Sequence, residues 1–140
     1  MKADVFLDSN VLLYAAADVK QEAAKKEAAL RLIADTDFGT SVQVLGEFYD
    51  NARRKAKLAI GPERMREVLR LLKSRPLVEG SVGVFDRAVA LAERYGIRYY
   101  DAAIVAAARE LGARTLYSED LSDGQEYDGV EVVNPFRGLD

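Results

Sequence analysis

The chain contains neither cysteine nor histidine among its 140 residues. Without cysteine there can be no disulfide framework, thiolate zinc site, iron–sulfur cluster or cysteine nucleophile. Without histidine there can be no Ser-His-Asp triad and no imidazole ligand or general base. Any bound metal must therefore have oxygen ligands, which favours Mg²⁺, Mn²⁺ or Ca²⁺. Acid–base chemistry is left to carboxylates, lysine and tyrosine.

Long hydrophobic runs are also missing. Residues 1–4 lack the apolar stretch of a signal peptide. The longest apolar runs, Val11–Ala17 and Ala102–Ala108, are far shorter than the ~20 residues that span a bilayer. We therefore expect a cytoplasmic protein with no membrane partner.

The composition is that of a globular protein. Hydrophobic residues make up 49% of the chain and charged residues 31%, a balance unlike that of a disordered chain. A length of 140 residues predicts one domain over residues 1–140, which can bury roughly two-thirds of its surface.

Short apolar segments alternate with amphipathic ones along the chain. Strands are expected at 5–7, near 40, at 76–78, 115–117 and 131–133, and helices at 11–16, 21–34, 42–58, from 62, at 84–95 and at 101–111. Gly96 and Gly112 follow the last two helices as C-cap residues should. This alternation predicts an α/β fold with a mostly parallel sheet and helices on both faces.

Acidic residues stand where such a fold places ligands, beyond the carboxyl ends of the strands. Asp8 follows the strand at 5–7, and Asp120 follows the strand at 115–117. Asp101 opens the alanine-rich helix, and Glu47 lies one turn into the helix that Ser41 is expected to cap. Each has an ordinary alternative: Asp8 and Asp101 as helix N-caps, Glu47 as an exposed helix residue, Asp120 as a polar loop residue.

Taken together, these carboxylates favour a metal site. Several acids at one sheet edge repel each other, and a fold tolerates this when a divalent cation lies between them. Without histidine or cysteine, such a pocket suits Mg²⁺ or Mn²⁺ and phosphate chemistry.

A basic segment suggests a polyanionic substrate, although the whole chain has a net charge of −3. Residues 53–75 hold nine basic and two acidic residues, a net of +7 that leaves −10 for the rest. We expect Arg53, Arg54 and Lys57 to contact RNA backbone. The alternative is a pair of solvated helices whose charges serve solubility.

The motifs that contain these acids resemble those of PIN-domain ribonucleases. The matching segments run in order along the chain: Val5–Leu12, Gln43–Tyr49, Tyr100–Ile104 and Leu116–Leu121. The tail Gly129–Phe136 is similar to the VapC-like toxins of bacterial type II toxin–antitoxin systems. The resemblance covers nearly the whole chain.

The resemblance implies a three-layer α/β/α fold and an Mg²⁺-dependent endoribonuclease that hydrolyses RNA with a metal-activated water. It makes Asp8, Glu47, Asp101 and Asp120 the catalytic, metal-binding acids, with Asn10 and Ser118 as supporting polar residues. Glu119 or Asp123 could take part beside Asp120 or in its place. It also implies a homodimer and a cognate antitoxin whose segment fills a groove near the site.

Two other functions stay open on the sequence. One is a catalytically silent PIN-like module that acts through protein partners. The other is a metal-dependent phosphatase, although Asp8-Ser9-Asn10 lacks the second aspartate of the Asp-x-Asp motif that haloacid-dehalogenase-type enzymes need. A mononucleotide-binding module fits less well, because no glycine-rich phosphate loop follows the first strand.

Overall fold

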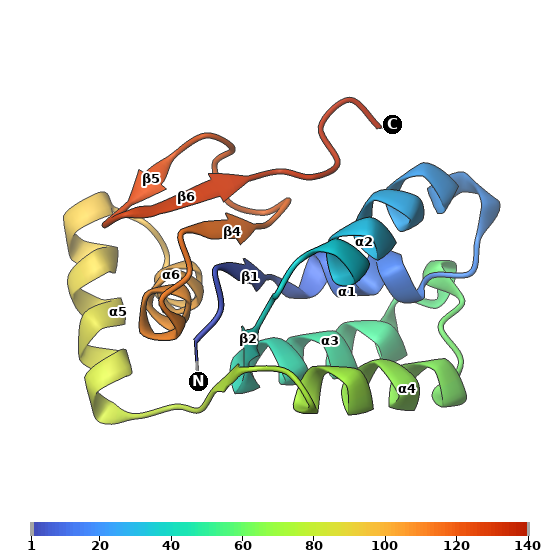
Figure 1. The fold of residues 1–140 in the computed structure, drawn as a ribbon, viewed down its shortest axis with the longest axis horizontal. Coiled ribbons are helices and arrows are strands. Elements are labelled where there is room, and N and C mark those ends of the chain that lie inside the picture. Colours follow the sequence, from blue (N-terminus) through green and yellow to red (C-terminus); the bar gives the residue numbers. More distant parts are fainter. Residues whose placement is uncertain (1, 140) are drawn as a thin grey trace.

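The computed structural model describes residues 2–139, which form a mostly parallel sheet flanked by helices in a three-layer α/β/α arrangement (Figure 1). The main sheet has the strand order β1 (Val5–Leu7), β4 (Thr115–Tyr117), β6 (Val130–Val133) and β5 (Glu126–Tyr127). β1, β4 and β6 are parallel, and β5 pairs antiparallel with β6. The expected fold class is confirmed.

A second, two-stranded sheet extends the first. β2 (Thr40–Ser41) pairs in parallel with β3 (Leu77–Val78). The residue before β2, Gly39, bridges to Phe6 of β1, so the two sheets join edge to edge. A Cβ at Gly39 would lie 2.6 Å from the Pro76 carbonyl oxygen and 2.8 Å from a Leu111 methyl carbon. Only glycine fits this close approach without a shift of the backbone.

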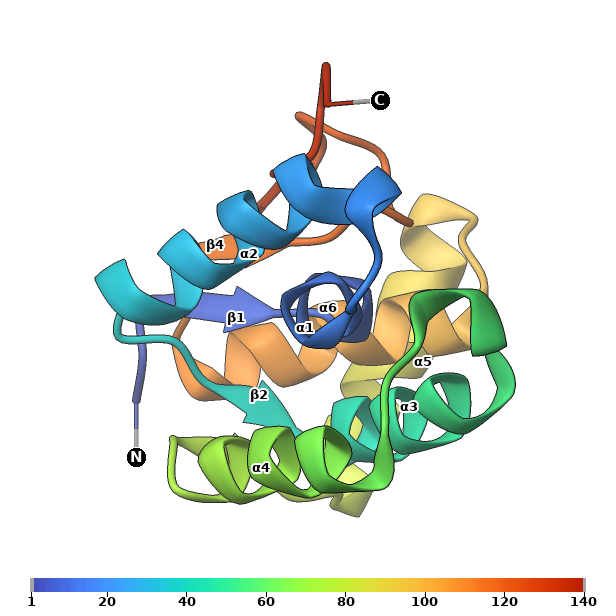
Figure 2. The ribbon, with the colours of Figure 1, turned by 90° about the vertical axis from the view of Figure 1, so that its right-hand side faces the viewer.

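Within residues 2–139, six α-helices pack around the sheets, with a short 3₁₀ turn before α2 and another after α3. In chain order the helical elements are α1 (Ser9–Ala16), η1 (Lys20–Glu22), α2 (Ala23–Asp35), α3 (Val42–Arg54), η2 (Ala56–Leu58), α4 (Pro62–Lys73), α5 (Val82–Tyr95) and α6 (Tyr99–Leu111). Seen from the side in Figure 2, α1 lies at the end of β1, with α2 above it and α3 and α4 below. No helix in residues 2–139 is long and apolar enough to cross a membrane.

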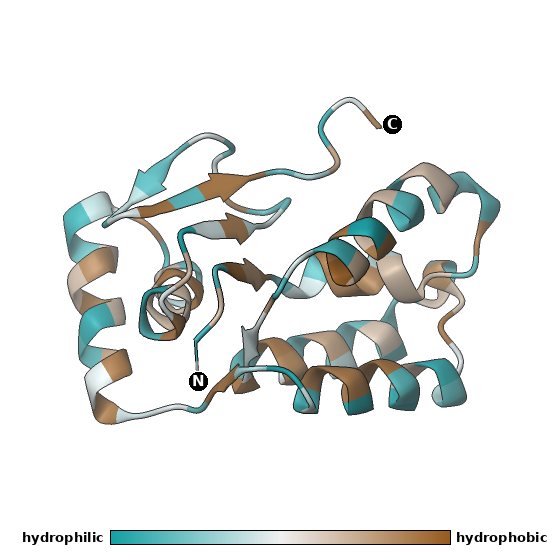
Figure 3. Ribbon diagram, in the orientation of Figure 1, coloured by the Kyte–Doolittle hydropathy of each residue, from teal (hydrophilic) through white to brown (hydrophobic). Residues whose placement is uncertain are grey.

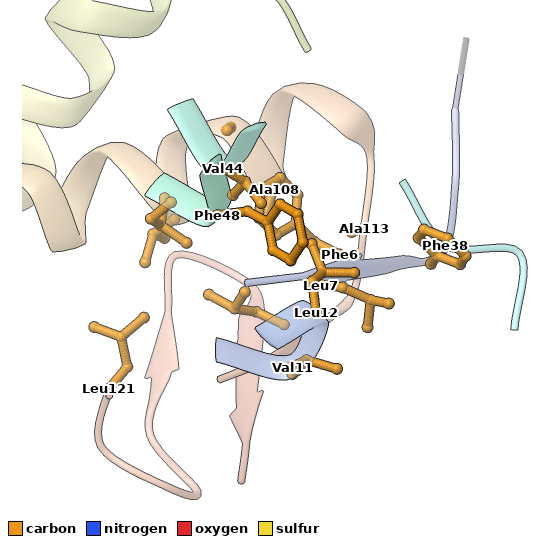
Figure 4. Close-up of a cluster of buried hydrophobic side chains, with 14 of the residues drawn as sticks. Phe6, Leu7, Val11, Leu12, Phe38, Val44, Phe48, Ala108, Ala113 and Leu121 are labelled. Atoms are coloured by element: carbon orange, nitrogen blue, oxygen red, sulfur yellow. The ribbon is translucent and has the colours of Figure 1, made fainter. Parts of the chain in front are cut away.

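Helix α6 is largely buried and contacts the strands of both sheets as well as α5. Its alanines, from Ala102 to Ala108, keep its surface small enough for neighbours to approach closely. The central cluster joins side chains from β1, α1, α3 and α6, among them Phe6, Leu12 and Phe48 (Figure 4). β1 is therefore fixed by packing against α6, and α1 by packing against α3.

The boundaries differ from the sequence predictions in a few places. The helix predicted over 42–58 ends at Arg54, and η2 follows it after a turn at Lys55. The helix predicted from Asp101 begins at Tyr99, and strand β5 was not predicted at all. The predicted C-caps are confirmed, because Gly96 and Gly112 both have positive φ angles. Ser41 caps α3 as expected, since its hydroxyl accepts from the Val44 amide.

Candidate active site

Asp8 stands at the junction between β1 and α1. Its backbone amide donates to the Tyr117 carbonyl of β4, which extends the β1–β4 ladder by one bond. Its side chain caps α1 by accepting from the Ser9 amide at 2.7 Å, so the capping role considered from the sequence is confirmed. In Figure 3 the hydrophobic colour of β1 gives way to more hydrophilic colour where the strand ends and α1 begins. The carboxylate is 5% exposed, which is unusual for an aspartate with no cation beside it.

Ser118 and Asn10 connect Asp8 to Asp120. The fully buried Ser118 hydroxyl donates to Asp8 at 2.7 Å and accepts from the Asp120 amide at 3.2 Å. The Asn10 side-chain amide donates to Asp120 at 3.1 Å, and more weakly to the Ser118 hydroxyl at 3.4 Å and to Asp8 at 3.5 Å. The side-chain oxygen of Asn10 accepts from the Glu119 backbone amide at 3.1 Å. The predicted acids Asp8 and Asp120 and both predicted supporting residues thus form one hydrogen-bonded network.

Burial and neighbouring charge disfavour the ionised form of Asp8. Loss of solvation raises the pKa of its carboxyl from 3.8 to about 6, although hydrogen bonds from Ser118 and the Ser9 amide oppose the shift. The charges of Glu47 and Asp120 are smaller contributions to the same rise in pKa. Three of the four predicted acids are therefore close enough to interact electrostatically.

Glu47 approaches this region from α3. The Gln43 side-chain amide, one turn earlier, donates to the Glu47 carboxylate at 3.2 Å and to the Tyr100 carbonyl of α6 at 3.3 Å. Gln43 therefore ties Glu47 to the residue directly before Asp101. Gln43 was not among the predicted site residues, although its place four residues before Glu47 on a helix was visible in the sequence.

Asp101 lies in the first turn of α6 and is partly buried. The cap position belongs to Arg98, so the alternative in which Asp101 caps this helix is wrong. The helix begins two residues earlier than predicted because Tyr99 and Tyr100 join its first turn. An acid in the first turn is favourable for the helix dipole, whatever its further role.

The two acids considered as alternatives to Asp120 have other partners. Glu119 accepts from Lys25 at 3.2 Å and from the Tyr14 hydroxyl at 3.4 Å. Asp123 accepts from the Asn134 amide at 2.8 Å and from Arg137 at 2.9 Å. Asp120 is the acid of this segment that shares the network of Asp8.

Lys25 is a further residue of the region that the sequence gave no sign of. Its ammonium lies 4.9 Å from the centre of the Tyr14 ring and 5.9 Å from that of Phe136. Burial alone would lower the pKa of Lys25, but its hydrogen bonds to Glu119 and Tyr14 raise it overall. Lys25 is therefore a charged residue that holds α2 against the segment after β4.

The donor chemistry of the site fits a hard divalent cation. Its side chains offer carboxylate, amide and hydroxyl oxygens, which are the ligands that a hard cation prefers. Within residues 2–139, no group of three or more acidic side chains is arranged so that it could hold a metal ion. The structure thus joins Asp8 to Asp120, brings Glu47 within electrostatic reach of Asp8, and gives no direct contact for Asp101.

The three basic residues predicted to bind RNA differ in their surroundings. The Arg53 guanidinium lies over the Tyr49 ring, with 5.3 Å between them, and Arg54 pairs with Asp50 at 3.0 Å. Lys57 lines a cavity that Asp120 also lines.

The family model described as PIN domain matches residues 5–122. The chain belongs to the PIN-domain family. The match includes all four predicted acids of this PIN domain and both supporting residues. No curated protein matches the sequence.

Solved structures share the fold of this PIN domain at low sequence identity. A toxin–antitoxin complex from Klebsiella pneumoniae has a TM-score of 0.66 and 21% identity, covering 94% of this chain and 97% of that one. VapC20 of Mycobacterium tuberculosis, described as a sarcin–ricin loop cleaving toxin, has a TM-score of 0.67 and 20% identity, covering 91% and 98%. VapBC2 of Rickettsia felis, bound to promoter DNA, has a TM-score of 0.60 and 20% identity, covering 91% and 96%.

Proposed function

We propose that this PIN domain is a divalent-metal-dependent endoribonuclease, with Mg²⁺ as the ion and Mn²⁺ as a substitute. The observation that carries the proposal is the network in which Ser118 and Asn10 hold Asp8 beside Asp120 at the carboxyl ends of β1 and β4. Burying Asp8 costs stability, and a fold keeps such an arrangement where it serves a function. Family membership supports nuclease chemistry for it.

The metal would be held by Asp8, Glu47, Asp101 and Asp120. When bound, a divalent cation lowers the pKa of water and stabilises charge on phosphoryl oxygens. The residues of the chain orient this chemistry: Ser118 fixes one Asp8 oxygen, the Ser9 amide fixes the other, and Asn10 fixes Asp120. A water that attacks the phosphorus in line breaks the P–O3′ bond, leaving a 5′-phosphate and a 3′-hydroxyl.

We further propose that the chain is the toxin of a type II toxin–antitoxin pair, acting as a homodimer in the cytoplasm. The similar folds of a toxin–antitoxin complex and of VapBC2 support an antitoxin partner. The single domain over residues 1–140 stays part of this proposal. Arg53, Arg54 and Lys57 are proposed contacts for RNA backbone.

The test of this function is cleavage of total RNA by purified protein with Mg²⁺, with EDTA, and with Mn²⁺ added after EDTA. We expect cleavage that EDTA stops and Mn²⁺ restores, and fragments that a ligase requiring a 5′-phosphate accepts. Cleavage of equal rate with EDTA would exclude metal dependence. No cleavage with any divalent ion would instead favour the silent binding module.

A further inference from the structure

A cavity of about 110 Å³ lies beside the candidate active site and is lined by opposite charges. It is lined by Asn10 of α1 and by Glu119 and Asp120 of the segment after β4. Asn51 of α3, Lys55 between α3 and η2, and Lys57 of η2 also line it. Asn10 and Asp120 belong to the network around Asp8, so the cavity is a direct continuation of that site.

The two lysines of the cavity carry charges that nothing in residues 2–139 neutralises. Neither the Lys55 nor the Lys57 ammonium has a hydrogen bond, ion pair or aromatic ring contact with any described residue. The neighbouring Arg53 and Arg54 do have such partners, in Tyr49 and Asp50. The lysines are thus available to an anion.

Three acids line this cavity, Glu22, Glu119 and Asp120, and two of them are held in place by other groups. Glu119 is paired with Lys25 at 3.2 Å, and Asp120 accepts from Asn10. The lysines do not fold across the cavity to pair with them. Lys55 and Lys57 therefore keep positive charges at the cavity that can attract an anion.

The backbone that carries the lysines is firmly attached. Leu58, the last residue of η2, is 6% exposed, and its carbonyl accepts from the Asp18 amide at 2.9 Å. The Leu58 amide donates back to the Lys55 carbonyl at 3.0 Å. In Figure 2 the turn between α3 and α4 lies beside the end of α1. The two lysine side chains therefore start from fixed positions at the cavity.

We propose that Lys55 and Lys57 bind the RNA phosphate next to the one that is cut, in this cavity. The inference rests on the proposed function, because it is the RNA strand that carries the second phosphate. Lysine ammonium groups suit a phosphate oxygen as compact point charges with several donors each. The Asn51 amide, which donates to the Glu47 carbonyl, fixes the helix end behind them.

The experiment compares the double variant Lys55→Gln/Lys57→Gln with Lys26→Gln/Lys73→Gln, which removes the same charge away from the cavity. The substrate is an oligoribonucleotide containing a site that the protein cuts in total RNA. We expect KM to rise about tenfold for the cavity variant, with kcat and the melting temperature unchanged. The slope of log affinity against log salt should fall by about 0.7, the contribution of one phosphate on a single strand. The control should match the wild type.

A second arm locates the phosphate. Each linkage beside the cut is replaced in turn by a neutral methylphosphonate. For the wild type, one such replacement next to the cut should raise KM, and for the cavity variant the same replacement should have no further effect. If the cavity variant behaves like the control, the inference is wrong. It is also wrong if no linkage distinguishes the variant from the wild type. Neither result contradicts the proposed nuclease activity. A wild type that neither binds nor cuts RNA overturns the proposed function itself.

Discussion

Replacement of Asp8 by asparagine tests whether the fold bears an electrostatic cost at the site. The pKa of Asp8 is raised from 3.8 to about 6. At pH 7, where the carboxyl is ionised, this lowers the free energy of unfolding by about 3 kcal/mol. Asparagine keeps the shape and an oxygen for the Ser9 amide. Its NH₂ group takes the place of the oxygen that accepts from the Ser118 hydroxyl at 2.7 Å and from the Asn10 amide at 3.5 Å, at a cost of about 1 kcal/mol.

We therefore expect metal-free Asp8→Asn to exceed the wild type in free energy of unfolding by about 2 kcal/mol at pH 7. For a chain of this length that is a rise of roughly 6 °C in melting temperature. The assay is urea unfolding in EDTA, with the exposed Asp86→Asn on α5 as a control that should not change.

The pH dependence of unfolding tests independently whether Asp8→Asn is more or less stable than the wild type. Because the folded-state pKa of Asp8 is raised, the folded wild type holds its proton more tightly, and its stability increases as the pH falls from about 6 towards 3.8. The advantage of Asp8→Asn should therefore shrink by about 1 kcal/mol between pH 7 and pH 5. An Asp8→Asn protein that is less stable than the wild type at pH 7, with a gap independent of pH, would refute the reasoning.

Other positions give equally direct predictions. Gly39→Ala should destabilise the fold by about 2 kcal/mol in urea unfolding, since its Cβ would lie 2.6 Å from a carbonyl oxygen, whereas Gly46→Ala on open helix surface should stabilise slightly. An unchanged urea midpoint for Gly39→Ala would mean that the backbone at Gly39 can move apart from Pro76 without loss of stability. Ser118→Ala removes the 2.7 Å bond to Asp8 and should lower stability by about 1–3 kcal/mol, together with the RNA cleavage rate. Glu119→Gln should leave Mn²⁺ affinity unchanged by titration, because its carboxylate is held by Lys25; a large loss of affinity would make Glu119 a ligand.

Much of the fold could be predicted because local pattern and tertiary packing agree. Val5–Leu7 is apolar on both faces and is a buried parallel strand, and Gly96 and Gly112 end helices with the positive φ that favours glycine. The boundary at Arg54 could not be predicted, because the helical pattern continues to Leu58 while η2 turns away to bury it. β5 has only two residues and depends on its pairing with β6.

The candidate site was predictable to the extent that chain order places acids at strand ends. Asp8 and Asp120 follow strands that pair as neighbours, so their proximity follows from the topology. Ser118 and Asn10 were expected from the family resemblance, and the structure joins them by a hydrogen bond. Contacts made by long side chains from distant helices could not be predicted, as with Lys25 on Glu119 or Gln43 on the Tyr100 carbonyl.

The central claim is that Asp8, Glu47, Asp101 and Asp120 together hold a divalent cation. Its most direct test is a Mn²⁺ titration followed by electron paramagnetic resonance, for the wild type and for each single Asp→Asn or Glu→Gln variant, with Asp86→Asn as control. We predict that each of the four substitutions weakens Mn²⁺ binding about tenfold or more and that the control binds like the wild type. Wild-type affinity in Asp101→Asn, the acid with no direct contact to the others, would contradict the four-carboxylate site.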